Sequence, residues 1–588
     1  MRGVGMKFEV VAQIFDEIDR TASRLEITAQ LALLLRRASV IETEIIVNLA
    51  LGLLRPAYKG SKFNFSVKSF IPVLADLSQI AVEHVQSRYE QLGDLGSVAQ
   101  EIIGNRSGKS LEVVEIYQQL VALENYTGTG SQELKASTLL SLLGELDGIS
   151  AKYIVRIIIG TLRLGFSDMT LVDALSWMET GNKSIRLIIE AAYNRCADLG
   201  FIASQLKDGG VERIKSMGVV VGIPVRLAAA ERLPSPQEIF DKIGSCIAQP
   251  KLDGMRLQIH LDKKGVEGNP RVNFFSRNLL DVTHMFPELA NELLKLPVEQ
   301  LIADGEAIVY DPNTKDFLPF QETAKRKRKH GIEAAVEELP VKLFLFDILY
   351  ENGIDFLDEP FYFRRKKLID LLMHAPETIQ LISQREINSA HELEEYFLEM
   401  IEHGLEGVVV KKIDSSYQAG KRNFNWIKFK RLAQDELEDT IDCVIVGYYA
   451  GAGKRAALGM GAFLVGIFNP QQDCFQTVAK VGSGLTDEEW RELKKKCDVY
   501  ALKERPHNVE CAKELYPDVW ILPQIVCSVL ADEITRSPLH TAGKTQAELG
   551  YALRFPRFVG YREDKSPEQA TSVLEFLEMY AHQKSVKK

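Results

Sequence analysis

The hydrophobic pattern of this sequence changes its period near residue 220, and this change constrains the fold more strongly than composition does. From about residue 8 to about residue 210, apolar residues recur at three- and four-residue intervals, as on the buried face of a helix. A connector with Pro234 and Pro236 follows, and beyond it strand-like runs alternate with helical ones. The pattern therefore predicts an all-α domain over residues 1–218 and an α+β domain over residues 219–434.

A third pattern begins at Ile441. Short strand-like runs recur from there onward, and their spacing suits a small barrel. The predicted strands cover residues 443–449, 463–468, 475–481 and 524–530. We therefore expect a C-terminal β-barrel of the OB-fold type over residues 435–588, in a multidomain chain long enough for three domains.

Composition argues against two classes of protein. No apolar run reaches the roughly 18 residues that a membrane-spanning helix requires, and the N-terminus lacks the apolar core of a signal peptide. The seven cysteines are scattered without a C-x-x-C pair, which argues against a zinc ribbon and against a disulfide framework. We therefore expect a protein without membrane contact in a reducing compartment, and a prokaryotic cytoplasm, near the nucleoid, is the simplest location.

The formal net charge of −10 is unusual for a protein that binds nucleic acid, but the basic residues are clustered. The clusters are Lys325–Lys329, the stretch from Lys421 to Arg431, and Lys454–Arg455. Phosphate binding depends on local charge, so that each cluster is a candidate phosphate contact. An ordinary solvated surface is the alternative.

A candidate nucleophile lies in the stretch Lys251-Leu252-Asp253-Gly254-Met255-Arg256, just before an alternating, strand-like run. A lysine amine becomes nucleophilic when it loses its proton, and desolvation or a neighbouring cation such as Arg256 favours that loss. Gly254 would let the backbone approach a ligand closely. The alternative is a surface lysine beside a turn.

Four further charged residues lie in strand-like runs or at their ends. Glu306 lies within one run, Glu406 precedes another, and Lys428 and Lys430 alternate along a third, so that they share one face. Together with Lys251 they would form a site in which carboxylates hold Mg²⁺ and lysines bind a triphosphate. Taken singly, each is an ordinary carboxylate or strand lysine.

A second candidate phosphate site lies in the helical region. Residues 156–165 read R-I-I-I-G-T-L-R-L-G and place Arg156, Arg163 and Gly165 ahead of the next expected helix. Arginine side chains and free backbone N–H groups at a helix entrance can bind a phosphate chain. A close crossing of two helices at the glycines is the alternative.

Several motifs occur in the order that is typical of one enzyme family. After K-L-D-G-M-R come F-S-R-N, D-G-E-A, F-D-I-L-Y-E-N-G, E-G-V-V-V-K and W-I-K-F-K. This series resembles the covalent nucleotidyltransferases and, among them, the three-domain ATP-dependent DNA ligases of cellular and archaeal type. The segment of residues 156–165 and the stretch from Arg554 to Lys565 resemble the same ligases. The resemblance implies an ATP-grasp-like adenylation domain between the helical domain and the OB-fold.

The resemblance also implies a mechanism. Lys251 would attack the α-phosphate of ATP, the AMP would move to the 5′-phosphate of a nick, and the 3′-hydroxyl would then seal the strand. Phe346 would stack on adenine, although a plain core position is the alternative. The implied binding residues are Gln249, Arg256, Arg277, Glu306, Phe346, Arg422, Lys428 and Lys430 for the nucleotide, Glu306 and Glu406 for the metal, and Arg156, Arg163 and Gly165 for DNA.

The implied cofactors are ATP and Mg²⁺, and the implied partner is nicked double-stranded DNA, in replication, repair and recombination. We expect a monomer that is flexible between its domains and closes around a nick. A sliding clamp is a further candidate partner, although neither terminus carries a Q-x-x-φ-x-x-aromatic-aromatic peptide.

Two other functions fit parts of the sequence. An RNA ligase or a capping guanylyltransferase shares the lysine motif, but the long helical region and residues 554–565 look specific to DNA ligases. A DNA-encircling protein without catalysis would not need the complete set of charged residues. Gln249 stands where many ligases have Glu, which leaves the nucleotide preference open, whereas the missing four-cysteine zinc site argues against NAD⁺.

Overall fold

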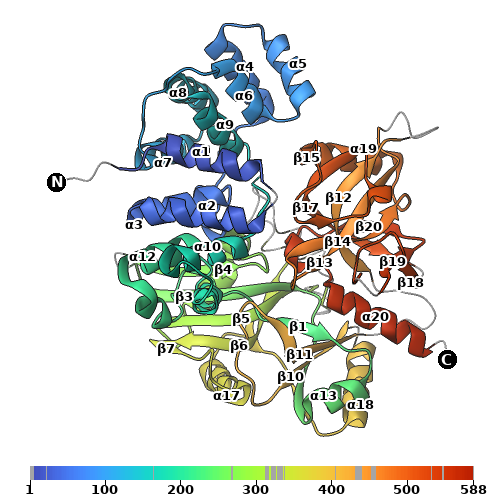
Figure 1. Cartoon of the computed structure of the whole chain (residues 1–588). Coiled ribbons are helices and arrows are strands. Elements are labelled where there is room, and N and C mark those ends of the chain that lie inside the picture. The colour runs from blue at the N-terminus through green and yellow to red at the C-terminus, as the bar shows by residue number, and fades with distance from the viewer. Residues whose placement is uncertain are drawn as a thin grey trace.

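The N-terminal part of the chain is built of helices, coloured from blue to green in the computed structural model (Figure 1). The structure describes residues 5–586 except 22, 163, 267–268, 312–316, 319–322, 324–325, 327–335, 337, 404, 431–439, 452–458, 532 and 546–547. We call residues 5–215 the helical unit. Its helices are α1 (Phe8–Asp19), α2 (Arg24–Arg37), α3 (Val40–Ala50), α4 (Val67–Ser78), α5 (Val82–Leu92), α6 (Leu95–Ile103), α7 (Val113–Asn125), α8 (Ser131–Glu145), α9 (Gly148–Ile158), α10 (Asp168–Thr180), α11 (Arg186–Arg195) and α12 (Leu199–Lys215).

Caps and a shared core hold these helices in place. Ser39 and Glu42 form a reciprocal capping box at the start of α3, and Asp147 accepts two backbone N–H bonds at the start of α9. The rings of Phe15 in α1 and Tyr153 in α9 pack edge to face, with centroids 5.6 Å apart in the common core. The predicted helical character of this region is confirmed.

The next part of the chain, which we call the middle unit (residues 219–430), contains two sheets. One has the strand order β1-β11-β10-β2-β9, and the other has the order β4-β3-β5-β6-β7, with β8 paired to β6. The strands are β1 (Ala229–Arg232), β2 (Cys246–Pro250), β3 (Met255–Val266), β4 (Asn269–Phe275), β5 (Gln300–Val309), β6 (Val341–Glu351), β7 (Ile354–Asp355), β8 (Ile379–Leu381), β9 (Arg385–Ile387), β10 (Gly407–Lys412) and β11 (Arg422–Lys430). The helices are α13 (Pro236–Ile243), α14 (Pro287–Leu293), α17 (Phe361–Leu372) and α18 (Ala390–Glu402).

The path of the chain between these sheets positions the lysine motif. Strand β2 belongs to the first sheet and β3 to the second, so that residues 251–254 cross from one sheet to the other. Gly254 is required at this crossing, because a Cβ atom there would lie 2.5 Å from the carbonyl oxygen of Ala307. Lys251 therefore lies at the junction of the two sheets, where a ligand can meet side chains from both.

The remainder, the C-terminal unit (residues 440–586), is rich in strands. The larger sheet has the order β15-β17-β12-β13-β14-β16, with β20 paired to β17, and β18 pairs with β19 separately. Its elements are β12 (Ile441–Tyr449), β13 (Ala462–Asn469), β14 (Cys474–Val481), α19 (Asp487–Asp498), β15 (Ala501–Leu502), β16 (Val509–Glu510), β17 (Val519–Leu530), β18 (Glu533–Ser537), β19 (Gly550–Arg554), β20 (Arg557–Tyr561) and α20 (Val573–Val586). The four strands predicted from the sequence are confirmed as parts of β12, β13, β14 and β17.

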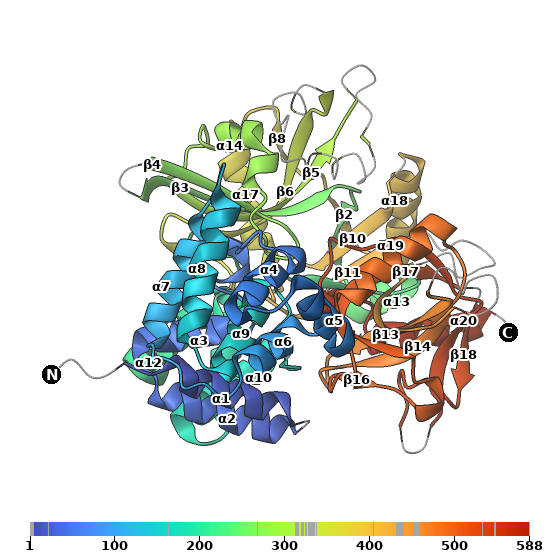
Figure 2. The ribbon, with the colours of Figure 1, turned by 90° about the horizontal axis from the view of Figure 1, so that it is seen from above.

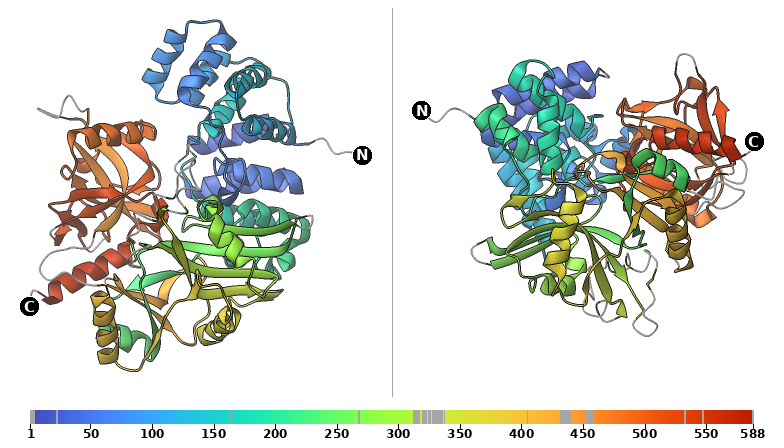
Figure 3. Two further views of the ribbon diagram at one scale, coloured as in Figure 1. Left: turned by 180° about the vertical axis from the view of Figure 1, so that it is seen from behind. Right: turned by 90° about the horizontal axis from the view of Figure 1, so that it is seen from below.

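The three units contact one another pairwise (Figure 2, Figure 3). Arg195 of the helical unit pairs with Asp355 of the middle unit at 2.9 Å. Arg24 of the helical unit pairs with Asp473 in the β13–β14 turn of the C-terminal unit at 3.3 Å. Helix α20 of the C-terminal unit lies against the middle unit and runs below the β-rich part in Figure 1. Among the described helices, none is both long and apolar enough to cross a membrane.

Candidate active site

Lys251 and Glu406 form the centre of the site. The ammonium group of Lys251 lies 2.5 Å from Glu406 Oε2, and Lys430 Nζ lies 2.9 Å from the same oxygen. The backbone N–H of Lys251 donates to the carbonyl of Gly407, which fixes the lysine beside the start of β10. Burial opposes ionisation of Glu406, but the two lysines hold its pKa at about 2. The structure therefore brings together three of the predicted site residues around one carboxylate.

Glu306 is a second carboxylate of the site, with a different electrostatic environment. It lies in β5, directly opposite Arg256 of β3 in the ladder. Burial raises the pKa of Glu306 to about 7, against the opposing effects of Lys251 and Arg256, and the negative charge of Glu406 adds to the increase. Two carboxylates with pKa values displaced in opposite directions face the same lysine, which is common at sites that bind a cation or transfer a proton.

Arg256 lies in a network that the sequence did not reveal. Its guanidinium donates to Asp304 at 2.8 Å and to the carbonyl of Ala228 at 2.9 Å, and the Tyr417 hydroxyl donates to Asp304 at 2.6 Å. Asp304 is fully buried. Its position in the D-G-E-A motif was the available signal, because an aspartate two residues before Glu306 shares its face of the strand. These hydrogen bonds fix the orientation of the Arg256 side chain next to Glu306.

An aromatic cluster lies next to this network. Phe346 is half-buried, and the guanidinium of Arg256 lies 5.4 Å from its ring centroid. Lys411, which ends the E-G-V-V-V-K motif, lies 4.7 Å from Phe346 and 4.2 Å from the ring of Trp426. Burial lowers the pKa of Lys411 to about 7, although Asp347 opposes the shift. Phe346 is thus backed by cations, whereas sequence reasoning gave Lys411 no role.

A face of cationic residues continues along β11 and the loop after β4. Arg422 and Lys428 both pair with Glu575 of α20, at 2.5 and 2.9 Å. These two cations hold the pKa of Glu575 far below its usual range, although burial acts in the opposite direction. Burial and the nearby Arg256 lower the pKa of Arg277 to about 10. Glu575 was not identified from the sequence, because its partners lie about 150 residues earlier in the chain.

Gln249 is almost completely buried in β2, paired with Val409 in the sheet. Its side-chain Nε2 atom has no hydrogen-bond partner among the residues that the structure describes. A buried amide that is left without a partner costs free energy, and such groups occur where a ligand completes the hydrogen bonds. Gln249 therefore offers a donor to a bound molecule.

The predicted DNA-binding residues have different environments. Arg156 is 5% exposed and pairs with Asp94 at 2.7 Å and with Asp19 at 3.0 Å, so that its guanidinium faces inward and joins three helical segments. Gly165 has a φ of +68°, and a Cβ atom there would lie 3.1 Å from His507 of the C-terminal unit. Arg163 lies outside the described residues.

The basic clusters are described only in part. Lys325, residues 327–329 and the pair Lys454–Arg455 lie outside the described residues, as does the end of the predicted middle domain at residues 431–434. Arg326 is 2% exposed, donates to the carbonyl of Met285 and pairs with Glu288. The Arg326 side chain is therefore held in the core of the middle unit.

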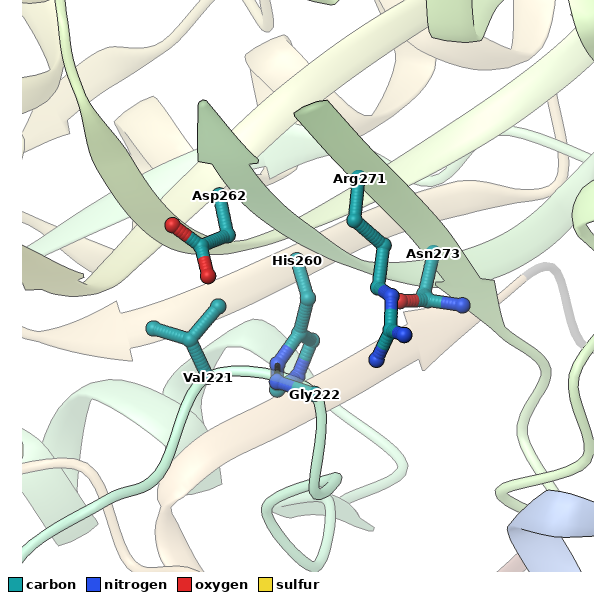
Figure 4. Close-up of a pocket in the computed structure, with 6 residues that line it drawn as sticks. All are labelled: Val221, Gly222, His260, Asp262, Arg271 and Asn273. Atoms are coloured by element: carbon teal, nitrogen blue, oxygen red, sulfur yellow. Dashed lines mark hydrogen bonds between the residues drawn. The ribbon is translucent and has the colours of Figure 1, made fainter. Parts of the chain in front are cut away.

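Two cavities lie away from Lys251. The smaller, of about 20 Å³, lies beside β3 and β4 and is lined by residues that include His260 and Gly222 (Figure 4). Burial lowers the pKa of His260 to about 3, and its neutral ring accepts from the Gly222 N–H at 3.0 Å. The larger, of about 830 Å³, runs between the helical and C-terminal units, past Asn64, Gly160 and Gln524. Of these two cavities, the larger has room for part of a polypeptide or nucleic-acid chain.

Family models and relatives that match this chain carry the description of a DNA ligase. The family described as "ATP dependent DNA ligase domain" matches residues 228–430, "DNA ligase N terminus" matches residues 7–176, and "ATP dependent DNA ligase C terminal region" matches residues 456–565. The "Probable DNA ligase" of Dictyoglomus turgidum is 44% identical over 584 residues, 99% of each chain. The "DNA ligase 2" of Thermofilum pendens is 38% identical over 597 residues, 98% of each chain. A solved structure, "mycobacterial DNA ligase D complexed with ATP and MES", covers 59% of this chain and 97% of its own at 24% identity, with a TM-score of 0.33.

Proposed function

This chain belongs to the ATP-dependent DNA ligases, since a DNA ligase relative matches it over 99% of its length. We therefore propose a role in nick sealing for each group of the site. The family joins the ends at a nick in duplex DNA through an adenylate intermediate, and this chain is a DNA ligase that uses ATP. The roles below rest on the geometry around Lys251.

In the first step Lys251 is the nucleophile. Its Nζ atom, after losing a proton, forms a bond to the α-phosphorus of ATP, and the bond from that phosphorus to the bridging oxygen breaks, so that pyrophosphate leaves with the electron pair. Lys430 lies on the same side of Glu406 as Lys251 and neutralises the charge that develops on the α-phosphate. The three-residue cluster at 2.5 and 2.9 Å is the observation that carries this assignment.

Two carboxylates suit Mg²⁺. Glu306 and Glu406 offer the hard oxygen ligands that this ion prefers, and Mg²⁺ is commonly held by one or two carboxylates together with substrate phosphates. Among the described residues no group of three or more His, Cys, Asp or Glu could form an all-protein cage. When bound, Mg²⁺ would supply positive charge against the phosphates. Binding to Glu406 would also take this carboxylate away from Lys251.

The nucleotide base would lie between β2 and the aromatic cluster. We assign recognition of the adenine edge to Gln249, whose unpartnered Nε2 can donate and whose Oε1 can accept. Phe346 would stack on the ring, supported from behind by Lys411. Arg256 would orient the ribose side of the site. A guanine base presents a different hydrogen-bond pattern at the same edge, and this difference is the basis for a preference for ATP.

DNA would be held by all three units. In the second and third steps AMP moves from Lys251 to the 5′-phosphate of the nick, and the 3′-hydroxyl displaces AMP to close the strand. We assign Arg277 to the 5′-phosphate, and Arg422 and Lys428 to neighbouring phosphates once Glu575 has moved away. The cavity past Gly160 and the adjoining segment to Gly165 would receive the duplex through backbone N–H groups.

The architecture supports three domains, which we place at residues 1–218, 219–434 and 435–588, with the last an OB-fold. The antiparallel order of β12, β13, β14 and β17 supports an OB-fold assignment. We further propose that the protein acts as a monomer in the cytoplasm of a prokaryote, near the nucleoid. A sliding clamp remains a candidate partner.

A labelling experiment tests the proposed function. The chain is incubated with α-³²P-labelled ATP or GTP in the presence of Mg²⁺ and analysed on a denaturing gel, alone and after addition of nicked DNA. We expect label from ATP that nicked DNA removes, and none in Lys251→Ala. The matched control is Lys59→Ala, far from the site in the sequence and on the helical unit, which should label normally. Label from GTP alone would favour a capping enzyme, and absence of label would favour a non-catalytic DNA-binding protein.

A further inference from the structure

Asp442 is a buried carboxylate outside the residues assigned so far. It is the second residue of β12 and is 6% exposed. Its backbone is held by Thr571, because its N–H donates to Thr571 Oγ1 at 3.1 Å and its carbonyl accepts from the N–H of Thr571 at 2.8 Å. The Ser528 hydroxyl donates to Oδ1 at 2.7 Å from the neighbouring strand β17. The position of this carboxylate is therefore fixed by the fold.

Two cations share the carboxylate. Arg562 Nη1 donates to Oδ1 and Oδ2 at 3.1 and 3.0 Å, and Lys565 Nζ donates to Oδ2. Both cations belong to the stretch from Arg554 to Lys565 and come from the loop after β20. Asp564 holds the other side of the Arg562 guanidinium, with contacts of 2.8 and 2.7 Å. Asp442 is thus the shared anchor for Arg562 and Lys565.

This anchored pair faces the site of the middle unit. Gln569 donates to the carbonyl of Arg277 at 3.2 Å, and Asn278 donates to the carbonyl of Glu563 at 3.5 Å. These contacts join the loop after β20 to the loop after β4. The pair therefore lies on the side of the C-terminal unit that contacts the loop carrying Arg277 in the middle unit.

Without a carboxylate the two cations would be unfavourable here. Burial, together with the positive charges of Arg277 and Arg562, lowers the pKa of Lys565 to about 7, although Asp442 opposes the shift. The carboxylates of Asp564 and Glu575 also interact with Lys565. Removal of the Asp442 charge would therefore favour the neutral amine and weaken the hold on the guanidinium.

We propose that Asp442 is the positioning residue for Arg562 and Lys565 during adenylation of Lys251, where it keeps both side chains together, charged and directed at the pyrophosphate end of ATP. This inference rests on the proposed function of the site, in which Lys251 displaces pyrophosphate from ATP. Asp442 itself does not touch the substrate. It acts through the two cations, which would bind the phosphates of ATP while Asp442 holds their side chains in place.

The test separates the chemical steps in the Asp442→Asn variant of the full chain. Self-adenylation with labelled ATP and Mg²⁺ is followed in a single turnover, and sealing of nicked DNA that already carries the 5′-adenylate is followed without ATP. We expect adenylation to slow by about tenfold or more, as for other losses of preorganised charge, and sealing to stay within about twofold. The loss should be greater at pH 8 than at pH 6, because the charged fraction of Lys565 falls further in the variant than in the parent as the pH rises.

Two comparisons keep the test specific. Glu563→Gln makes the same carboxylate-to-amide change at an exposed neighbouring position and should leave both steps within about twofold of the parent. Lys565→Ala should slow adenylation, and adding Asp442→Asn to it should cost much less than in the parent, since the two residues act together. Equal losses in both steps, a loss independent of pH, or full additivity with Lys565→Ala would overturn the inference. If the parent chain itself takes up no label, the proposed function fails instead.

Discussion

The ammonium group of Lys251 lies 2.5 Å from the carboxylate of Glu406, and Lys430 contacts the same oxygen from the adjacent strand. The proposed nucleophile is therefore held as one half of an ion pair. Its amine must leave this pair before it can attack, and a cation that binds Glu406 would favour that release. Metal binding and activation of the nucleophile would thus be coupled through a single side chain.

Glu406→Gln should impair adenylation more than it impairs folding. The amide cannot hold a divalent cation or the two lysines as a carboxylate does, so we expect the adenylation rate to fall by at least about 100-fold. A titration with Mg²⁺ at saturating ATP is the measurement, and the variant should need a higher concentration for its residual activity. Glu402→Gln, an exposed change at the end of α18, is the control. A normal Mg²⁺ dependence in Glu406→Gln would remove Glu406 from the metal site.

Removal of Glu575 should open the protein and expose its phosphate-binding cations. Arg422 and Lys428 would lose their partner on α20, so that we expect a larger radius of gyration in solution scattering and tighter binding of nicked DNA at low salt. Glu575→Ala is compared with Glu548→Ala, which changes an exposed glutamate of the same unit. Unchanged scattering together with unchanged DNA affinity would show that the two ion pairs do not hold α20 in place.

The stability of the α20 contact should depend on pH through Glu578. Burial raises the pKa of Glu578 to about 7, and Glu231 and Glu575 contribute to the increase. A carboxyl group whose pKa is raised by folding destabilises the folded state as the pH rises from its ordinary pKa of 4.5 to about 7. Glu578→Gln should therefore be more stable than the parent at pH 8, by about 1 kcal/mol after allowance for solvent screening, and equal to it near pH 4.5.

The melting temperature at the two pH values measures this effect. A gain of about 1 kcal/mol corresponds to roughly 2–4 °C for a unit of this size. Glu514→Gln, at an exposed position of the same unit, should leave the melting temperature unchanged at both pH values. A gain for Glu578→Gln at pH 4.5 as large as at pH 8 would exclude the charge of Glu578 as the cause.

Loss of the Arg156 side chain should lower the free energy of unfolding of the helical unit and leave phosphate binding unchanged. Arg156→Leu would leave Asp94 and Asp19 without their buried partner, and we expect the helical unit to lose about 3–5 kcal/mol. Arg88→Leu removes an exposed pair with Glu101 and should cost less than about 1 kcal/mol. Denaturant unfolding gives both values. A stable Arg156→Leu variant that binds nicked DNA poorly would restore the phosphate contact expected from the sequence.

The residues that lie together around Glu406 were singled out from the sequence because they belong to short motifs. Lys251, Glu406 and Lys430 each lie within a run of residues whose order along the chain is informative, and the strand period places Lys428 and Lys430 on one face. The helical, mixed and strand-rich regions were also predicted, since periodicity reports which face of an element is buried. Roles for individual residues around Lys251 stay predictions until the variants are measured.

Contacts over long sequence separations could not be predicted in this way. Arg156 stands in a motif that suggests an exposed guanidinium, but its partners Asp94 and Asp19 come from two other helical segments, and the fold turns the side chain inward. Glu575 and Asp442 are ordinary carboxylates in the sequence. They become important only when α20 and β12 are packed, because their cationic partners lie 120 residues or more away in the sequence.

The contact of Arg24 and Ser167 with Asp473 closes the chain upon itself, since the helical unit is also joined to the middle unit and the middle unit to α20. A nick inside a chromosome or a plasmid has no nearby end on which a closed band could be threaded. If all three units surround the duplex, as proposed, the DNA must be admitted sideways through a break in this band and be enclosed afterwards. Release of a sealed circular product would then require the Asp473 contact to open again.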